Sequence, residues 1–201
     1  RSSSAASDVY KRQPYKGWKG NQFEGGIKTP MIMTWKNKIK SNTQFDGFIS
    51  ALDIFKTSLE VSNVNDDLMV NADGKNIMNY LNDNIIQNEN LFWRKDKMAT
   101  VRSGNYKLIR LNDTSTVLYN IENNFFEDLD LKLKEPLIHD SLFKLLSVWE
   151  DRLIDPNWIE NKDWNIVTEM IYEDLMANKN IRAVSPNCLL YTSDAADEER
   201  G

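Results

Sequence analysis

The two ends of the chain are related to each other at the level of DNA, and this relation limits which residues can belong to a fold. The segment Ser3 to Gln13, "SSAASDVYKRQ", can be back-translated into a DNA string whose reverse complement encodes Cys188 to Glu198, "CLLYTSDAADE". Two protein segments encoded by opposite strands of one string are typical of a sequencing adapter translated together with a gene. We therefore exclude residues 1–13 and 188–201 from the fold prediction.

This exclusion changes what the composition implies. The only cysteine, Cys188, lies in an excluded end, so the remaining segment has neither a disulfide nor thiol chemistry. The chain has a formal net charge of −5, of which the two ends contribute −1. A mildly acidic segment argues against a nucleic acid partner. No apolar run is long enough to span a membrane, so we expect no membrane span either.

The second half of the chain predicts a small antiparallel sheet covered by a helix. The stretch "MATVRSGNYKLIRL" (98–111) indicates two strands around a tight turn, and "STVLYNI" (115–121) indicates a third strand. Residues 135–153 indicate a helix with Pro136 in its first turn. Its apolar residues recur at helical spacing and form one stripe: Ile138, Leu142, Leu145, Trp149 and Leu153. The Trp-rich remainder, 155–176, predicts one further helix after a loop.

The first half predicts a strand followed by helices. The apolar run "TPMIMTW" (29–35) indicates a buried strand. In "SALDIFKTSLEVS" (50–62), Leu52, Phe55 and Leu59 follow helical spacing. Ser50 and Asp53 form an N-cap pair, so Asp53 is expected to cap the helix rather than bind a ligand. Residues 75–83 indicate a short helix. Together the two halves predict an α+β arrangement.

The stretch Pro14 to Pro30, "PYKGWKGNQFEGGIKTP", contains four glycines, three lysines and one glutamate. Glycines allow the backbone to approach a ligand closely, and a lysine held there suits a tetrahedral oxyanion such as sulfate or phosphate. The alternative is a glycine-rich turn with solvated lysines. Composition alone favours this alternative, because glycine-rich motifs are often false positives.

The order of these residues resembles the sulfatase family, the formylglycine-dependent, arylsulfatase-like branch of the alkaline-phosphatase superfamily. Its members carry a segment of the form P-L-R-G-x-K-G-x-x-x-E-G-G-x-R-x-P. The chain departs from it at Lys16 and Lys28, where arginine is usual, so the two-pronged geometry of arginine is lost there.

Four later stretches resemble further family segments in the family's order, so that the resemblance covers nearly all of residues 14–155. They are "ISALDIFKTSLEVS", "ADGKNIMNYLND", "LFWRKDKMATVRSGNYKLI" and "VLYNIENNFFEDLDL". The implied fold is a fragment of the α/β, alkaline-phosphatase-like class. Residues 14–85 would form the C-terminal part of the catalytic domain, where its large mixed sheet ends. Residues 86–187 would form a small subdomain with an antiparallel sheet and a long helix.

The resemblance implies that the parent protein is a sulfuric ester hydrolase acting on small-molecule or carbohydrate sulfate esters. Family members use a formylglycine nucleophile and a calcium ion, and the nucleophile motif, the metal carboxylates and the catalytic histidines lie upstream of the position of Pro14. We therefore expect no metal ligand in this segment and no activity from the fragment alone. By family analogy the parent would be a periplasmic or secreted bacterial protein.

Among the residues present, Lys19 matches the family lysine that contacts the substrate sulfate. Glu24, Gly25 and Gly26 are expected to structure the loop. Two weaker candidates, Trp93 and Arg94, would line the substrate cleft, although a core or surface role is equally open for both.

Three other features have plainer interpretations. His139 is expected to be a surface or packing residue rather than a catalytic one. The acidic pairs Asp66–Asp67 and Glu127–Asp128 resemble calcium ligands, but isolated acidic pairs are usually solvated.

Two alternatives to a sulfatase remain open. The first keeps the superfamily and changes the ester, giving a phosphatase, phosphodiesterase or phosphonate hydrolase. The second is a non-catalytic homologue in which Lys19 binds sulfate without turnover.

Overall fold

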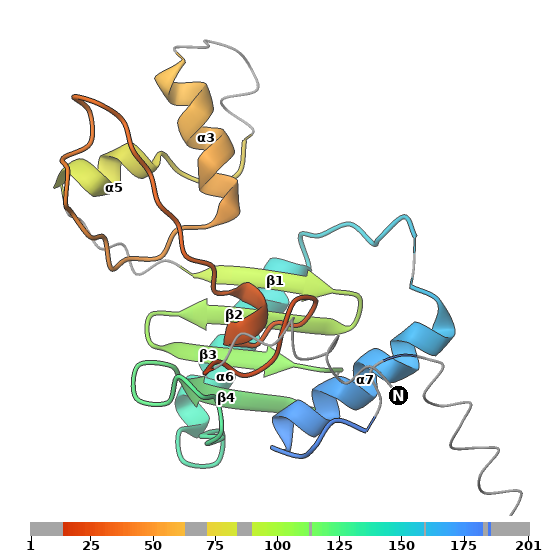
Figure 1. Cartoon of the computed structure of the whole chain (residues 1–201). Coiled ribbons are helices and arrows are strands. Elements are labelled where there is room, and N and C mark those ends of the chain that lie inside the picture. The colour runs from red at the N-terminus through yellow and green to blue at the C-terminus, as the bar shows by residue number, and fades with distance from the viewer. Residues whose placement is uncertain are drawn as a thin grey trace, which may run out of the picture. The chain divides into compact units, whose positions relative to one another are not determined.

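The computed structural model describes residues 14–62, 72–83, 90–112, 114–158, 160–182 and 185. The chain divides into two compact units (Figure 1). Unit 1 combines the residues up to Lys28 with those from Phe92 onward, and unit 2 is Thr29–Leu91. The predicted adapter ends lie outside the described residues. None of the helices in the described ranges has the length and apolarity that a membrane crossing requires.

Unit 1 is built on a four-stranded sheet with the order β1-β2-β3-β4, in which β2, β3 and β4 pair antiparallel. Its strands are β1 (Leu91–Lys95), β2 (Met98–Ser103), β3 (Tyr106–Arg110) and β4 (Thr116–Asn120). The predicted hairpin is confirmed, with Ser103 opposite Tyr106 and Gly104 at a φ of 54° in the turn. The third predicted strand is β4, paired with β3 through Leu118 opposite Leu108. Strand β1 was not predicted from the sequence.

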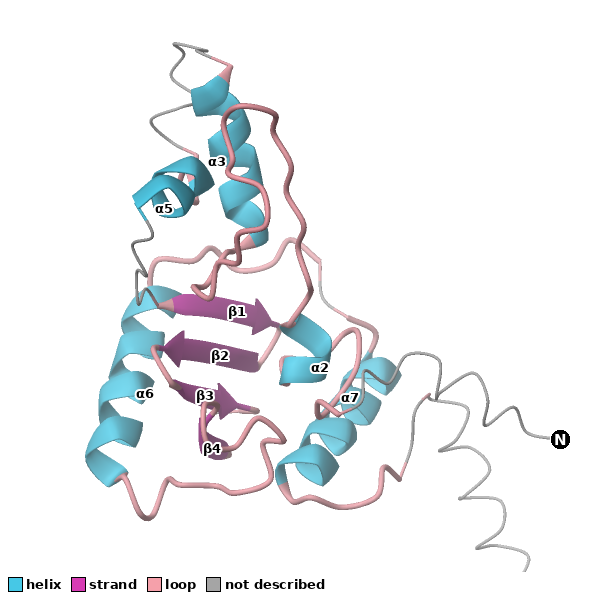
Figure 2. Cartoon of the chain, turned by 60° about the vertical axis from the view of Figure 1, so that its left-hand side comes forward, coloured by secondary structure: helices cyan, strands magenta, loops and turns pink. Residues whose placement is uncertain are grey.

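Helices cover both faces of this sheet (Figure 2). On one face, Val101 and Leu108 pack with Leu142 and Leu146 of α6 (Pro136–Glu150). This confirms the predicted helix, the place of Pro136 in its first turn, and four members of its apolar stripe. The fifth, Leu153, lies beyond the end of α6 and is 38% exposed. The other face packs with α7 (Lys162–Met176) and with the buried ring of Phe23. The two faces follow from the alternation of side chains along each strand.

Unit 2 contains the two predicted helices, α3 (Ala51–Val61) and α5 (Ile77–Asp83). The cap of α3 is confirmed as a capping box, in which Asp53 Oδ2 accepts a hydrogen bond from the Ser50 backbone N–H at 2.8 Å. Asp53 Oδ1 also accepts from the Lys75 backbone N–H at 2.9 Å. The buried positions of α3 are Asp53 and Thr57, whereas Leu52 and Phe55 are 56% and 57% exposed. The spacing therefore predicted the helix correctly, but two of its three apolar residues, Leu52 and Phe55, are not covered.

The predicted buried strand at residues 29–35 is wrong. This stretch forms no strand, and Met31, Ile32 and Trp35 are 43%, 92% and 40% exposed. A strand needs a neighbour for its backbone N–H and C=O groups, and the described residues of unit 2 before Leu91 include no strand. The end of a large mixed sheet is accordingly not seen among the described residues. The sheet that is present is the small antiparallel one.

The glycine-rich segment is divided between the units. Its residues 14–28 belong to unit 1 and are called the loop 14–28 below. The predicted domain boundary after residue 85 stays a prediction, because residues 84–89 are not described.

Candidate functional site

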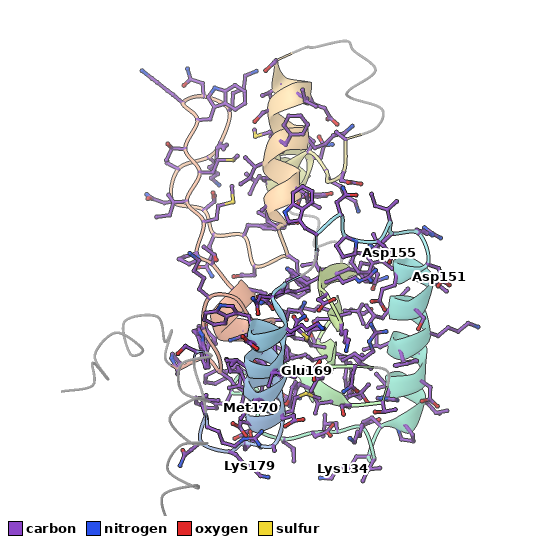
Figure 3. The ribbon with its side chains drawn as sticks, turned by 90° about the vertical axis from the view of Figure 1, so that its right-hand side faces the viewer. Lys134, Asp151, Asp155, Glu169, Met170 and Lys179 are labelled. Carbon is purple, nitrogen blue, oxygen red and sulfur yellow. The ribbon has the colours of Figure 1, made fainter. Side chains whose placement is uncertain are left out.

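The loop 14–28 lies against the sheet and α7, and it ends in the short helix α2 (Glu24–Ile27). Its Gln22 backbone N–H donates to Tyr172 Oη of α7 at 2.9 Å, and Figure 3 shows α7 beside this part of the chain. The Gln22 side chain donates to the Met98 carbonyl at 3.3 Å and accepts from Thr100 Oγ1 at 2.9 Å, both in β2. Backbone and side-chain contacts therefore fix the middle of the loop on unit 1.

Lys16 fixes the beginning of the loop. Its ammonium donates to the backbone carbonyls of Leu175 (2.9 Å) and Glu127 and to the side chain of Asn178. The same nitrogen lies 5.5 Å from the ring centre of Phe23, a cation–π distance. Burial lowers the pKa of Lys16, which the charge of Glu127 opposes. A lysine at this position, where the family has arginine, thus serves as an internal anchor rather than as an anion ligand.

Four charged side chains form a cluster beneath the loop, called the buried charge cluster: Glu24, Arg102, Lys107 and Glu127. Lys107 Nζ lies 3.0 Å from Glu24 Oε1 and 2.8 Å from Glu127 Oε1, and all three side chains are fully buried. Arg102 Nη1 lies 3.6 Å from Glu24 Oε2. Two cations therefore balance two carboxylates, and of the four only Arg102 keeps some exposed surface.

Burial shows in the acid–base behaviour of this cluster. It raises the pKa of Glu127, which Lys107 opposes, and it lowers the pKa of Arg102, which Glu24 opposes. Glu127 was expected to be a solvated member of an acidic pair, and this is wrong, because its side chain has no exposed surface. Asp128 beside it is exposed. The sequence did not indicate that Glu127 is buried, because its partner, Lys107, is distant along the chain.

The members of the buried charge cluster come from three of the stretches that resemble sulfatase segments. Glu24 belongs to the glycine-rich segment, Arg102 and Lys107 to "ATVRSGNYKLI", and Glu127 to "IENNFFEDL". The fold brings these stretches together at one point. The sequence contained one indication that Lys107 is buried. Because side chains alternate along a strand, Lys107 lies on the face opposite to Leu108, and both faces of the predicted sheet needed to be covered.

The two consecutive glycines are required by close backbone approach. A Cβ on Gly25 would lie 2.5 Å from the Gly17 carbonyl oxygen, and one on Gly26 would lie 1.9 Å from the Asn21 carbonyl oxygen. Both distances are too short for any side chain. Together with Glu24, these glycines let the loop fold back on itself, where the Gly25 N–H donates to the Lys16 carbonyl at 2.8 Å.

Lys19 lies at the exposed tip of this closed loop, followed by Gly20 with a φ of 102°. Within the described part of the chain its ammonium makes no hydrogen bond and no ion pair. Lys16 on one side of it and Glu24 on the other are both held by unit 1. The arrangement presents one uncommitted cation on a fixed backbone, which is what binding an external anion requires.

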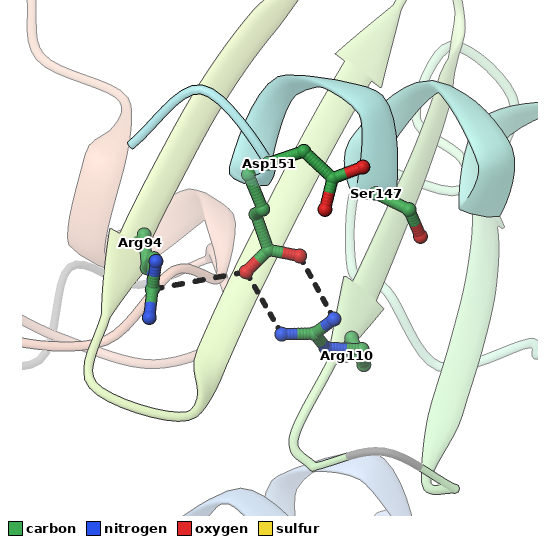
Figure 4. A pocket seen from close by; sticks show the side chains of 5 residues that line it. Arg94, Arg110, Ser147 and Asp151 are labelled. Carbon is green, nitrogen blue, oxygen red and sulfur yellow. Dashed lines mark hydrogen bonds and ion pairs between the residues drawn. The ribbon is translucent and has the colours of Figure 1, made fainter. Parts of the chain in front are cut away.

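The structure does not bring Arg94 together with Lys19. Arg94 lines a polar pocket of about 320 Å³ with Arg110, Ser147, Glu150 and Asp151 on the α6 side of the sheet (Figure 4). Both Nη atoms of Arg110 lie 2.8 Å from the Glu150 carboxylate oxygens, and Arg94 Nε lies 3.8 Å from the same carboxylate. The loop 14–28 packs on the opposite face. Trp93 is half-buried on β1. A cleft-lining role for Trp93 and Arg94 stays a prediction.

His139 is a packing residue, as predicted. Its Nε2 lies 3.0 Å from Thr116 Oγ1, and its Nδ1 lies 3.0 Å from Asp140 Oδ1. The imidazole stacks on Phe143 with an interplanar angle of 20°.

The described residues do not fit a calcium site. No group of three or more His, Cys, Asp or Glu side chains in the described ranges could hold a metal ion. The pair Asp66–Asp67 lies outside the described residues, and Glu127 is committed to Lys107.

Comparisons with known proteins bear on the chain and its fold. No family model matches the chain. The uncharacterized sulfatase YdeN of Escherichia coli K12 is 34% identical over 68 residues, which are 34% of this chain and 12% of that protein. The chain is similar to part of a sulfatase. The resemblance predicted from the sequence is thereby confirmed.

Solved structures extend this likeness to the fold. The structure of Ps i-CgsB in complex with k-i-k-neocarrahexaose matches 87% of this chain with a TM-score of 0.69 at 22% identity. A Bacteroides thetaiotaomicron structure, BT33336S-sulf, reported with the metabolism of multiple glycosaminoglycans, matches 69% of it with a TM-score of 0.59 at 20% identity. The chain spans 41% and 32% of these two proteins. At this identity the likeness shows a shared fold.

Proposed function

We propose that this chain is the C-terminal part of a sulfuric ester hydrolase and that Lys19 contacts the sulfate group of its substrate. The observation that carries this proposal is the contrast within the loop 14–28. Lys16 and Glu24 are committed to internal contacts, whereas Lys19 between them is exposed and has no partner in the described part of the chain. The partial similarity to sulfatases supports the choice of sulfate as the anion.

The chemistry of Lys19 follows from its charge and its rigid support. A compact ammonium suits a tetrahedral oxyanion, and it stabilises negative charge that grows on sulfate or leaving-group oxygens during ester cleavage. Because the loop is already fixed, little reorganisation is needed when that charge develops. The described residues contain no C/S-x-P-S-R motif from which the formylglycine implied by the family could be made, and no group of three or more acidic, His or Cys side chains that could hold its calcium ion. We therefore propose that the fragment alone is inactive.

Carbohydrate sulfate esters are the substrate class that we propose for the parent. The support comes from two structures with the same fold: one was solved with neocarrahexaose, and the other was reported with glycosaminoglycan metabolism. Export to the periplasm or the cell exterior is the matching proposal for its location.

The test starts from the source DNA. The reading frame upstream of the Pro14 codon is sequenced, and the complete parent is expressed and purified. It is assayed with para-nitrophenyl sulfate, para-nitrophenyl phosphate, a phosphonate monoester and a sulfated oligosaccharide, with release of the free anion as the readout. The proposal expects sulfate release and a Cys or Ser in a C/S-x-P-S-R motif upstream.

The other outcomes separate the alternatives. Release of phosphate or phosphonate without sulfate would move the chain to phosphoester chemistry. Binding of sulfate that depends on Lys19, without turnover of any ester, would indicate a non-catalytic homologue. A parent that neither binds nor releases these anions would contradict the proposal.

A further inference from the structure

We propose that Lys107 of β3 and Glu127, which follows β4, are positioning residues that hold Lys19 in place. This inference rests on the proposed contact between Lys19 and the sulfate. Both residues are fully buried and neither touches the solvent, so any effect on the substrate passes through the loop 14–28.

Glu127 holds the loop on both sides of Lys19. Its backbone carbonyl accepts a hydrogen bond from the Lys16 ammonium, three residues before Lys19. Its carboxylate Oε2 accepts from the Glu24 backbone N–H at 2.8 Å, five residues after Lys19. The Gly25 N–H closes the loop onto the Lys16 carbonyl at 2.8 Å. One residue thus fixes both ends of the segment that carries the exposed cation.

Lys107 sets the orientation of these carboxylates. Its ammonium lies 3.0 Å from Glu24 Oε1 and 2.8 Å from Glu127 Oε1, so the carboxylate of the loop and the carboxylate of Glu127 share one cation. Without Lys107, two buried carboxylates would face each other with no cation between them, leaving Arg102, 3.6 Å from Glu24, and the more distant charge of Lys16 as compensation. Glu24 would then be driven away from Glu127, and the loop would move with it.

A positioning role explains why charges are used here at all. Apolar side chains of similar volume often stabilise a core as well as a buried ion pair does, because burying charges carries a large desolvation cost. Ionic and hydrogen-bonded contacts depend on distance and angle, so they fix the position of the loop that carries Lys19 more closely than apolar packing does. A displacement of about 1 Å at a catalytic group can lower the rate on the order of 10²-fold.

The catalytic test uses a double-mutant cycle in the complete parent enzyme. Lys107→Met is expected to lower kcat/KM for sulfate release on the order of 10²-fold in the folded enzyme. In the Lys19→Ala background the same substitution should lower kcat/KM little further, because the group that it positions is gone. Glu127→Gln, which keeps an acceptor for the Glu24 N–H, provides a milder second variant. Lys144→Met, at an exposed lysine of α6, is the matched control.

A structural readout runs in parallel on the present chain. Hydrogen exchange, followed by mass spectrometry, is measured for peptides that cover residues 14–28 and, for comparison, α6. In Lys107→Met and Glu127→Gln we expect exchange in the loop to accelerate roughly tenfold more than exchange in α6, since α6 packs on the opposite face and reports only the general loss of stability.

The outcomes are distinguishable. Equal loss of kcat/KM in both backgrounds would show that Lys107 acts only through general stability, and it would overturn the inference. Loop exchange that accelerates no more than exchange in α6 in both folded variants would overturn it as well. If Lys19→Ala itself leaves kcat/KM unchanged, the proposed function of Lys19 fails, and the positioning role falls with it even if the loop loosens.

Discussion

Replacing Lys107 with methionine should expose the energetic weight of the buried charge cluster. The substitution keeps an unbranched side chain that is one atom shorter and removes its charge, leaving Glu24 and Glu127 fully buried without the cation that lies 3.0 and 2.8 Å from them. Breaking a buried pair in this way typically costs about 3–5 kcal/mol. Folded domains are stable by only about 5–15 kcal/mol, so the variant should be close to marginal.

The assay is urea unfolding followed by circular dichroism, with Lys144→Met as the control. The control changes the same residue type at an exposed position and should alter the unfolding free energy by less than about 0.5 kcal/mol. A deficit of under about 1 kcal/mol for Lys107→Met would refute the reasoning, because it would mean that the carboxylates are not buried with their charges.

The pH dependence of the stability deficit of Lys107→Met provides an independent test of the same prediction. Burial already raises the pKa of Glu127 in the folded state, and Lys107 opposes that rise. A carboxyl whose folded pKa lies above the unfolded one contributes stability below the unfolded pKa, and this contribution is lost as the pH rises through the folded pKa. Without Lys107 the pKa of Glu127 should rise further, so the deficit should shrink as the pH is lowered from about 7 towards about 4. A deficit that grows on acidification would contradict this.

Two further substitutions test the loop and the helix cap by the same unfolding assay. Gly26→Ala places a Cβ 1.9 Å from the Asn21 carbonyl oxygen and should cost about 1–3 kcal/mol, whereas an unchanged midpoint would show that the loop is not closed as described. Asp53→Ala removes an acceptor from two backbone N–H groups and should cost about 1–2 kcal/mol. Leu52→Ala on the same helix, at an exposed site, should change stability by less than about 0.5 kcal/mol, and a larger loss would show that this face is buried.

Local signals predicted most of the elements. The capping pair of Ser50 and Asp53, the turn at Gly104 and the first-turn Pro136 each act within a few residues, and each element is present where expected. The stripe on α6 was also predictable, because its periodicity matches one face of a helix against a sheet.

The failures all involve partners that are distant in sequence. Residues 29–35 have the composition of a strand, but a strand forms only where another pairs with it, and the described part of unit 2 before Leu91 offers none. The apolar spacing of α3 gave a helix whose Leu52 and Phe55 are exposed, since periodicity identifies a face without showing what covers it.

The candidate site divides in the same way. Lys19 and the structural glycines follow from the order of residues in one short stretch. The role of Glu24 needed Lys107 and Glu127, which lie 83 and 103 residues away along the chain. A buried lysine on β3 is compatible with the sequence pattern, but its carboxylate partners become known only when the loop is placed on the sheet.

The most direct test of the account is the effect of Lys19→Ala on sulfate release by the complete parent enzyme. Lys144→Ala serves as the matched control, and folding of both variants is checked by circular dichroism. If Lys19 neutralises the sulfate, its removal should lower kcat/KM on the order of 10²-fold or more, while the control stays within about twofold of the parent. A folded Lys19→Ala enzyme that releases sulfate as fast as the control would contradict the central claim.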